Sequence, residues 1–344
     1  MTALSKRGRI AIAVAGAVVL AAVAVGYTQI AAQRDRNRAE SQVELANEED
    51  MGPGPKMQIL TNGRLSMVSS GHPDGPRTVT SQACDRAYAA AGTVVCLRPV
   101  DALTGTHLVV FDAQLHERQS IALTGFPNRT RVSPSGRMVA WTLFIDGHSY
   151  ASGGFSTSTG ILDTRTGTLI RSLEEFAVVK DGQPYRAADA NFWGVTFADD
   201  NRFYASMSTG GRRYLVEGDI AARRLRTLAE DVECPSLSPD GTRIAFKHTN
   251  GGAGQQDHSQ AAHGGHDGPG ITWRLSTLDL ATLRITHLAE ARSVDDQAVW
   301  LDGATVAYSL QRPDGTNDVW AVPADGTGSP RLLIPEANSP APPQ

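Results

Sequence analysis

The amino-acid sequence predicts an all-β domain built from repeated antiparallel sheets and preceded by one apolar helix. Three observations lead to this prediction. Beyond residue 56, short runs of Val, Ile, Leu and aromatic residues are interrupted about every 8 to 12 residues by Gly, Asp, Asn or Pro, a pattern typical of many short strands. Within that region, one strand–turn–strand pattern recurs. Near the N-terminus, residues 10–25 consist entirely of Ala, Val, Ile, Leu and Gly.

The apolar N-terminal run has the features of a signal anchor. Lys6, Arg7 and Arg9 precede it, so a positively charged segment at residues 1–9 is followed by an apolar one. Residues 10–30 are long enough for a helix to cross a bilayer, which takes about 20 residues. The sequence therefore predicts a single-pass protein of the cytoplasmic membrane, with residues 1–9 in the cytoplasm and the C-terminal domain extracytoplasmic.

Cleavage of this segment is the alternative. Ala22, Val23 and Ala24 form a small-x-small site, and cleavage there would release a secreted protein. Residues 31–55 are polar, rich in Arg and Glu, and end in a Gly-Pro-Gly-Pro run. We expect them to form a linker between the membrane and the domain.

The recurring pattern consists of a strand end, a tight turn and a second strand. It is clearest at residues 237–246, and residues 132–141 match it position by position; looser copies cover residues 196–205 and 299–308. The Pro sets φ, and the Asp and Gly supply the turn geometry. A second hairpin follows each copy, so each repeat predicts one four-stranded sheet. Several such sheets arranged around an axis bury both faces and leave only short edges.

Counting the copies predicts a six-bladed β-propeller of four-stranded antiparallel blades over residues 56–340, followed by a tail at 341–344. The remaining blade begins at Met57 and shows three strands. Because residues 336–340 resemble the start of other blades, we expect them to supply the missing innermost strand and to close the ring. The five complete blades are predicted at residues 81–125, 126–175, 189–229, 230–290 and 291–334.

The Ser-Pro-Asp-Gly-x-x-Ile-Ala-Phe string at residues 238–246 resembles the repeat of TolB-type propellers, and the resemblance covers about residues 57–340. The whole chain is similar to membrane-anchored TolB-like proteins of high-GC Gram-positive bacteria, in agreement with its content of Ala, Arg and Gly. TolB itself is a periplasmic member of an envelope complex that contacts an outer-membrane lipoprotein, and we see no counterpart of its N-terminal α/β domain here. The resemblance implies a fold and an envelope location, whereas a fold alone does not define an activity.

The three cysteines fit an oxidising compartment. Cys84 and Cys96 fall in what the pattern predicts to be two adjacent strands, where they can form a disulfide, and Cys234 is left over. The alternative is three buried thiols.

A His- and Gly-rich segment at residues 248–270 falls where a blade turns from its second to its third strand. His258, His263, His266 and Asp267 are candidate metal ligands, because imidazole and carboxylate bind zinc, copper or nickel. The low-complexity composition favours a solvated loop insertion, in which ligands lose entropy on converging. We therefore expect no resident metal or other cofactor.

In a propeller, the loops that lead into the innermost strands surround the mouth of the central channel. Here they carry polar side chains of both charge signs, which suits a polar ligand, a peptide or a protein partner. The alternative is that these groups bind one another and ordered water, and so plug the channel. The candidate binding residues at the mouth are Arg86, Arg129, Asn191, Trp193, Glu233 and Asp296.

The sequence favours a protein that is not an enzyme. It contains no Gly-x-Ser-x-Gly elbow of the kind that hydrolases use. Its net charge of −4 leaves no basic surplus for phosphates, so we expect no nucleic-acid partner. The favoured function is an extracytoplasmic, membrane-anchored scaffold that binds a protein or peptide of the cell envelope. The alternative is a metal- or ligand-dependent envelope sensor, or a hydrolase, that uses the channel mouth or the His-rich loop.

Overall fold

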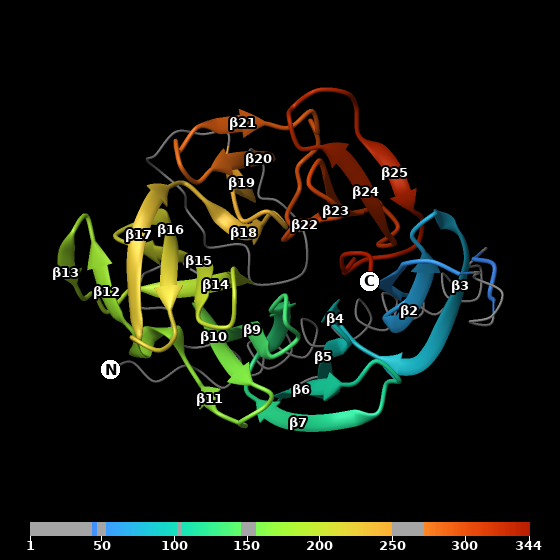
Figure 1. The fold of residues 1–344 in the computed structure, drawn as a ribbon, viewed down its shortest axis with the longest axis horizontal. Coiled ribbons are helices and arrows are strands. Elements are labelled where there is room, and N and C mark those ends of the chain that lie inside the picture. The colour runs from blue at the N-terminus through green and yellow to red at the C-terminus, as the bar shows by residue number, and fades with distance from the viewer. Residues whose placement is uncertain (1–42, 47–52, 102–104, 146–155, 250–271) are drawn as a thin grey trace, which may run out of the picture.

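The structure, a computed structural model, describes residues 43–46, 53–101, 105–145, 156–249 and 272–344. Six β-sheets, mostly antiparallel, surround a central axis (Figure 1), so the fold is the six-bladed β-propeller that the sequence predicts. The predicted transmembrane helix at residues 10–30 lies outside the described residues. Within the described ranges, no helix is long and apolar enough to cross a membrane.

The blades are named A to F in chain order. Blade A contains β1 (Lys56–Thr61), β2 (Arg64–Ser69) and β3 (His72–Ala83), and blade B contains β4 (Arg86–Ala90), β5 (Thr93–Asp101), β6 (Gly105–Phe111) and β7 (Glu117–Leu123). Blade C contains β8 (Phe126–Val132), β9 (Met138–Ile145), β10 (Ser156–Asp163) and β11 (Leu169–Ile170), and blade D contains β14 (Asn191–Phe197), β15 (Arg202–Thr209), β16 (Arg212–Asp219) and β17 (Arg224–Glu230). Blade E contains β18 (Glu233–Leu237), β19 (Arg243–Thr249), β20 (Trp273–Asp279) and β21 (Ile285–His287), and blade F contains β22 (Val299–Trp300), β23 (Thr305–Gln311), β24 (Asn317–Pro323) and β25 (Arg331–Ile334).

The Ser-Pro-Asp-Gly turn of blade E shows how the repeat folds. The Arg243 N–H donates to the Ser238 hydroxyl oxygen at 2.9 Å, and that hydroxyl donates to Asp240 at 2.5 Å. Gly241 has a φ of +71°, which residues with a Cβ rarely adopt. The turn between β18 and β19 is therefore set by the motif itself.

Glycine also makes room for the aromatic residues of the repeat. Trp141 on β9 lies opposite Gly160 on β10, and Phe203 on β15 lies opposite Gly218 on β16. A Cβ at either glycine would lie 2.2 Å from the facing ring. The glycines thus allow both rings to be buried between blades, at 1% and 0% exposure.

The C-terminal tail closes the ring by pairing with β1 (Figure 1). The backbones of Leu60 and Asn338 donate to each other at 2.8 and 3.0 Å. The Ala341 N–H donates to the Gln58 carbonyl at 2.9 Å, and the pairing continues to Gln344. The predicted closing segment at 336–340 therefore pairs as expected, and residues that the sequence assigned to a separate tail take part as well.

Blade D departs from the four-stranded pattern. A hairpin of β12 (Ala177–Lys180) and β13 (Gln183–Tyr185) adds to its outer edge, and β12 runs parallel to β17, which makes the sheet six-stranded. A short 3-10 helix, η2 (Leu173–Glu175), leads into the hairpin and is capped by the Ser172 side chain. The prediction left residues 176–188 outside any blade, because these strands are too short to show an alternating pattern.

Part of the predicted linker also contacts a blade. Leu45 forms a parallel bridge with Arg77 on β3. The Ala46 N–H donates to the Arg77 carbonyl at 3.0 Å, and the Arg77 N–H donates to the Glu44 carbonyl at 3.1 Å. This segment therefore covers part of the outer edge of blade A.

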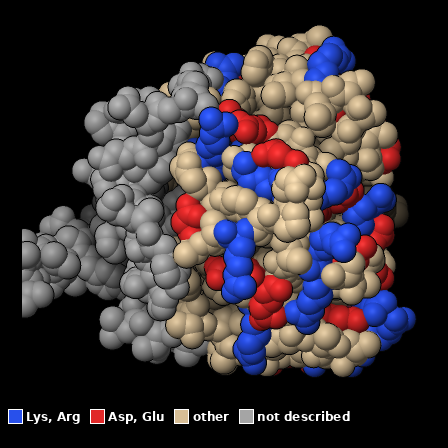
Figure 2. Space-filling model, turned by 90° about the vertical axis from the view of Figure 1, so that its left-hand side faces the viewer, with Lys and Arg blue, Asp and Glu red and all other residues tan. Residues whose placement is uncertain are grey.

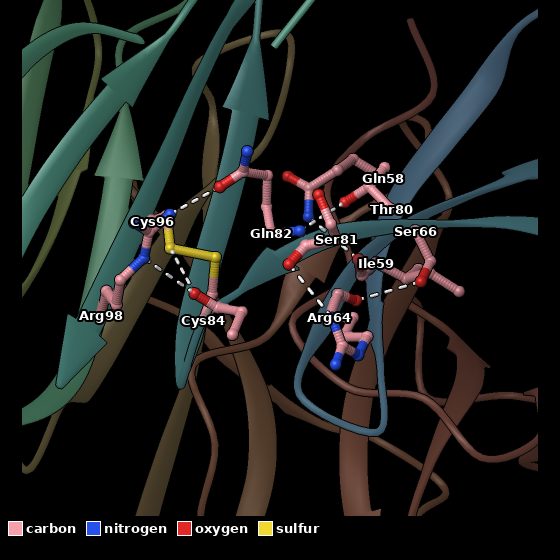
Figure 3. The surroundings of a disulfide bond; sticks show 11 residues. Gln58, Ile59, Arg64, Ser66, Thr80, Ser81, Gln82, Cys84, Cys96 and Arg98 are labelled. Carbon is pink, nitrogen blue, oxygen red and sulfur yellow. Dashed lines mark hydrogen bonds between the residues drawn. A yellow bond between two sulfur atoms is a disulfide. The ribbon is translucent and has the colours of Figure 1, made fainter. Parts of the chain in front are cut away.

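A disulfide joins Cys84 and Cys96 (Figure 3), as the sequence predicts. Cys96 lies on β5, but Cys84 follows β3, and its N–H donates to the Gly63 carbonyl of blade A at 2.9 Å. The bond therefore links two neighbouring blades, whereas the sequence placed both cysteines in one blade. Beside it, Arg98 donates to the Gln82 side chain at 2.7 Å and supports the same junction.

Candidate binding site at the channel mouth

Charged side chains from four blades gather at the end of the channel where the chain passes from one blade to the next. They come from the first strands of blades B, C and E, from the second strand of blade E, and from the segment before β22. Their charges act on one another directly. We call this set the mouth cluster; it consists of Arg86, Arg129, Arg131, Glu233, Lys247, Asp295 and Asp296.

Asp295 lies at the centre of the mouth cluster, where its carboxylate contacts two cationic side chains. Lys247 forms an ion pair with the Asp295 carboxylate, and Arg129 lies 3.8 Å from the same oxygen. The Lys247 and Arg129 side chains are 7% and 8% exposed, whereas that of Asp295 is 61% exposed. Lys247 and then Arg129 lower the pKa of Asp295 to about 2, so this carboxylate is ionised at neutral pH.

A second ion pair lies beside it. Arg213 donates to Glu233 at 2.7 Å, and the Glu233 side chain is 4% exposed. Burial raises the pKa of Glu233 to about 7, against the opposing effect of Lys247 and Arg213. The Trp273 ring covers both cations, because Lys247 lies 4.1 Å and Arg213 5.5 Å from its centroid.

Below the mouth, polar groups fill the channel. Arg131 donates to the Gln297 carbonyl at 3.0 Å and lies 4.4 Å from the centroid of the Tyr88 ring. The Gln297 amide donates to the Val195 and Pro235 carbonyls at 3.0 and 2.8 Å. The space around Arg131 and Gln297 leaves no volume accessible to water. These contacts join blades B, C, D, E and F across the axis, so here the polar groups do plug the channel.

The six residues that the sequence selected at the mouth divide into two groups. Arg129 and Glu233 belong to the ion pairs above; Arg86 donates to the Asn128 carbonyl at 2.8 Å, and Asp296 accepts from the Ser309 N–H at 3.0 Å. These four residues belong to the mouth cluster.

The other two residues of the selection lie on β14. Asn191 accepts from the Thr157 N–H and hydroxyl at 3.0 and 2.8 Å, which joins blade D to blade C. Trp193 is 3% exposed, so its ring is buried in the fold.

Sequence reasoning missed Lys247 and left Asp295 out of the selection. Lys247 follows the apolar run at residues 244–246 in β19, and a charge inside a buried strand is a signal that could have marked it. Cys234, the cysteine outside the disulfide, is buried beside this cluster. Burial raises the pKa of its thiol.

A separate hollow of about 380 Å³ lies between blades C and D, near the hairpin turns at the opposite end. Arg137 donates to both carboxylate oxygens of Asp163 on one wall, at 2.9 and 2.5 Å. Ile161 and Ile170 contribute apolar lining. The Arg137 side chain is 30% exposed, so the charged group of this hollow is more covered than Asp295 at the mouth.

No three His, Cys, Asp or Glu side chains of the described ranges are grouped so that they could hold a metal. The predicted candidates His258, His263, His266 and Asp267 lie outside the described residues.

No protein-family model and no curated protein matches the chain. Among solved structures, TolB from Acinetobacter baumannii is 13% identical with a TM-score of 0.54, over 84% of this chain and 67% of that one. A putative TolB from Agrobacterium tumefaciens is 12% identical with a TM-score of 0.47, over 84% and 92%. A puromycin-hydrolyzing peptidase from Mycobacterium tuberculosis is 16% identical with a TM-score of 0.45, over 83% of this chain but 44% of that one. The chain is thus a six-bladed propeller, and its fold is similar to that of TolB.

Proposed function

We propose that this chain is a non-catalytic, membrane-anchored propeller that binds a basic segment of a cell-envelope protein at the channel mouth, outside the cytoplasmic membrane. The layering of charge at the mouth is the observation that carries the proposal. The exposed group is the Asp295 carboxylate, and its counter-ions Lys247 and Arg129 are covered. An approaching partner therefore meets a fixed negative charge first.

The exposed rim around Asp295 carries more negative charge. Asp85 precedes β4, Asp231 precedes β18, and both are exposed. A lysine, an arginine or an amino terminus of a partner would form charge-assisted hydrogen bonds to these carboxylates. Trp273 is half-buried at the same place and offers an apolar surface for the aliphatic part of a basic side chain.

The rigidity of the mouth supports binding. Asp295 is held by Lys247 and Arg129, and the plug around Gln297 ties the surrounding blades together below it. Acceptors that are already in place cost little to order when a partner arrives.

The buried state of the titratable groups supports a non-catalytic role. Glu233 and Cys234 are the groups of the mouth whose pKa burial raises, and each is only 3% exposed. A general acid, base or nucleophile must reach the reacting atoms. The raised pKa of the Cys234 thiol also disfavours the reactive thiolate.

The outer surface at blade D gives no support for a nucleic-acid partner. Figure 2 shows basic and acidic side chains interspersed on the side of the ring that carries β12, β13 and β17. Arg212 pairs with Glu230 at 3.2 Å and Arg226 with Glu217 at 2.6 Å. A phosphate backbone favours a continuous basic stripe, which this side lacks.

Chemical crosslinking of the full-length chain in native membranes, followed by mass spectrometry, tests the proposal. Asp295→Asn removes the exposed charge with little change in shape. Asp302→Asn is the matched control, because Asp302 is an exposed turn residue at the opposite end of the propeller. We expect a partner whose crosslinked segment is rich in Lys or Arg, captured by the wild type and by D302N and lost with D295N.

Equal capture by D295N, or a partner segment that is acidic, would overturn the proposal. The intact mass of the purified chain is recorded in the same experiment. A retained metal or small molecule at one equivalent, without a protein partner, would instead favour the ligand-dependent sensor or hydrolase.

A further inference from the structure

Two histidines face each other on blade E, on its second and fourth strands. His248 on β19 and His287 on β21 flank Ser276 on β20, and their rings stack with centroids 5.3 Å apart at an interplanar angle of 25°. Ser276 lies opposite His287 in the β20–β21 register and opposite Phe246 in the β19–β20 register. The pairing of three neighbouring strands therefore places both imidazoles on one face of the blade.

Both rings direct a nitrogen at the same atom. His248 Nε2 lies 3.0 Å and His287 Nδ1 2.9 Å from the Ser276 hydroxyl oxygen. A hydroxyl has one proton, so it can donate to only one of the two nitrogens, and the other must donate to it. Two potential metal-binding nitrogens thus converge on one point, and Ser276 is fully buried beneath them.

A hydrogen bond to the Thr249 backbone helps to hold the His248 ring in place. Histidines that bind metals are commonly held in this way, with the second nitrogen left to the metal.

Solvent access to the two histidines and the charges around them determine how strongly the pair can bind a cation. His287 is exposed, so solvent reaches the pair from its side. Arg274 faces His248 across β19 and β20, and its charge opposes a bound cation; Asp231 acts in the opposite direction. With two protein ligands, the remaining coordination positions belong to water.

We propose that His248 and His287 form a binding site for a divalent late transition metal. Imidazole nitrogen suits copper, nickel and zinc, and the general order of affinities places Cu²⁺ above Zn²⁺. The two nitrogens bind the ion while Ser276 gives up its hydrogen bonds to them. Neither histidine belongs to the mouth cluster.

The test uses the full-length chain with His258, His263 and His266 all changed to Asn, which removes other imidazoles that could bind the same ion. Cu²⁺ and Zn²⁺ are titrated separately at pH 7.5, by calorimetry and, for Cu²⁺, by electron paramagnetic resonance. We expect one equivalent of Cu²⁺ with nitrogen coupling in its spectrum, and weaker binding of Zn²⁺.

Single substitutions then assign the ligands. His248→Ala and His287→Ala should each weaken Cu²⁺ binding by at least about tenfold, the smallest cost typical of disturbing a metal site. His72→Ala, at an exposed histidine of blade A, is the matched control and should leave the affinity unchanged. Ser276→Ala should retain the metal, because the hydroxyl competes for the nitrogens.

Three results would overturn this site: no binding by the triple-Asn chain, equal affinity in H287A, or loss of the metal in S276A with the fold intact. Melting curves without metal report folding of every variant. Because His287 is exposed, H287A decides the question even where H248A fails to fold.

Discussion

Removal of residues 337–344 should open the ring and lower the free energy of unfolding by about 5 kcal/mol. Five backbone hydrogen bonds join this segment to β1, at 2.8 to 3.0 Å: two between Leu60 and Asn338, one from Ala341 to Gln58, and two between Lys56 and Gln344. Each contributes about 1 kcal/mol net. Because folded domains are stable by only about 5–15 kcal/mol, this loss is a large part of the total.

Equilibrium urea unfolding followed by tryptophan fluorescence measures the change. Ala341→Pro is a milder variant, because it removes the N–H that donates to the Gln58 carbonyl and should cost about 1–3 kcal/mol. Pro343→Ala is the control, since its side chain is partly exposed, and it should stay within about 0.5 kcal/mol of wild type. An unchanged midpoint after the deletion would refute the idea that the tail closes and stabilises the ring.

Three further perturbations test other parts of the fold. Changing Cys84 and Cys96 together to Ser should cost about 3 kcal/mol, because the disulfide restricts the unfolded chain by closing a loop whose ends are 12 positions apart; a melting temperature insensitive to reducing agent would contradict this. Burial raises the pKa of Glu233 from 4.5 to about 7, so the folded state holds a proton more firmly than the unfolded state. The contribution of Glu233 to stability is therefore present below pH 4.5 and is lost as the pH rises through about 7. In melting curves recorded between these pH values, Glu233→Gln should not show this loss of stability. Gly194→Ala should cost about 1–3 kcal/mol in urea unfolding, because φ is +66° and the new Cβ would lie 2.9 Å from the backbone of β18; Gly210→Ala, with φ +58° and open space around it, separates the clash from the backbone strain.

The blades could be recognised from sequence because a hairpin is a local structure. The turn at Ser238, Asp240 and Gly241 is held by contacts between residues at most five positions apart. The same residues therefore predict the turn wherever the pattern recurs in the sequence. The pairing of Cys84 with Cys96 was predictable from their closeness in sequence, but the junction between blades that it joins was not.

The edge pairings could not be recognised in this way. Leu45 meets Arg77, and β12 meets β17, through backbone groups that every residue carries. Such contacts do not require particular side chains, so the sequence pattern does not reveal them. For this reason the sequence predicted only a linker for residues 31–55 and assigned residues 176–188 to no blade.

At the candidate site, too, the sequence predicted the local features but not the contacts between distant segments. The sequence pointed to the loops at the mouth and to Arg86, Arg129, Glu233 and Asp296. It did not show that Asp295 lies exposed above its cations. That arrangement joins Lys247 and Asp295, which are 48 positions apart, and brings Arg129 to them from a third blade.

By itself the sequence determined the repeat, the number of blades and the closing role of residues 336–340, because turn chemistry and alternating strands act over a few residues. The tertiary structure alone decided which charges at the mouth are covered, which imidazoles of blade E converge on Ser276, and which edges the linker and the β12–β13 hairpin cover. Burial and charge pairing depend on distances between segments far apart in the chain, and those distances exist only once the ring has closed.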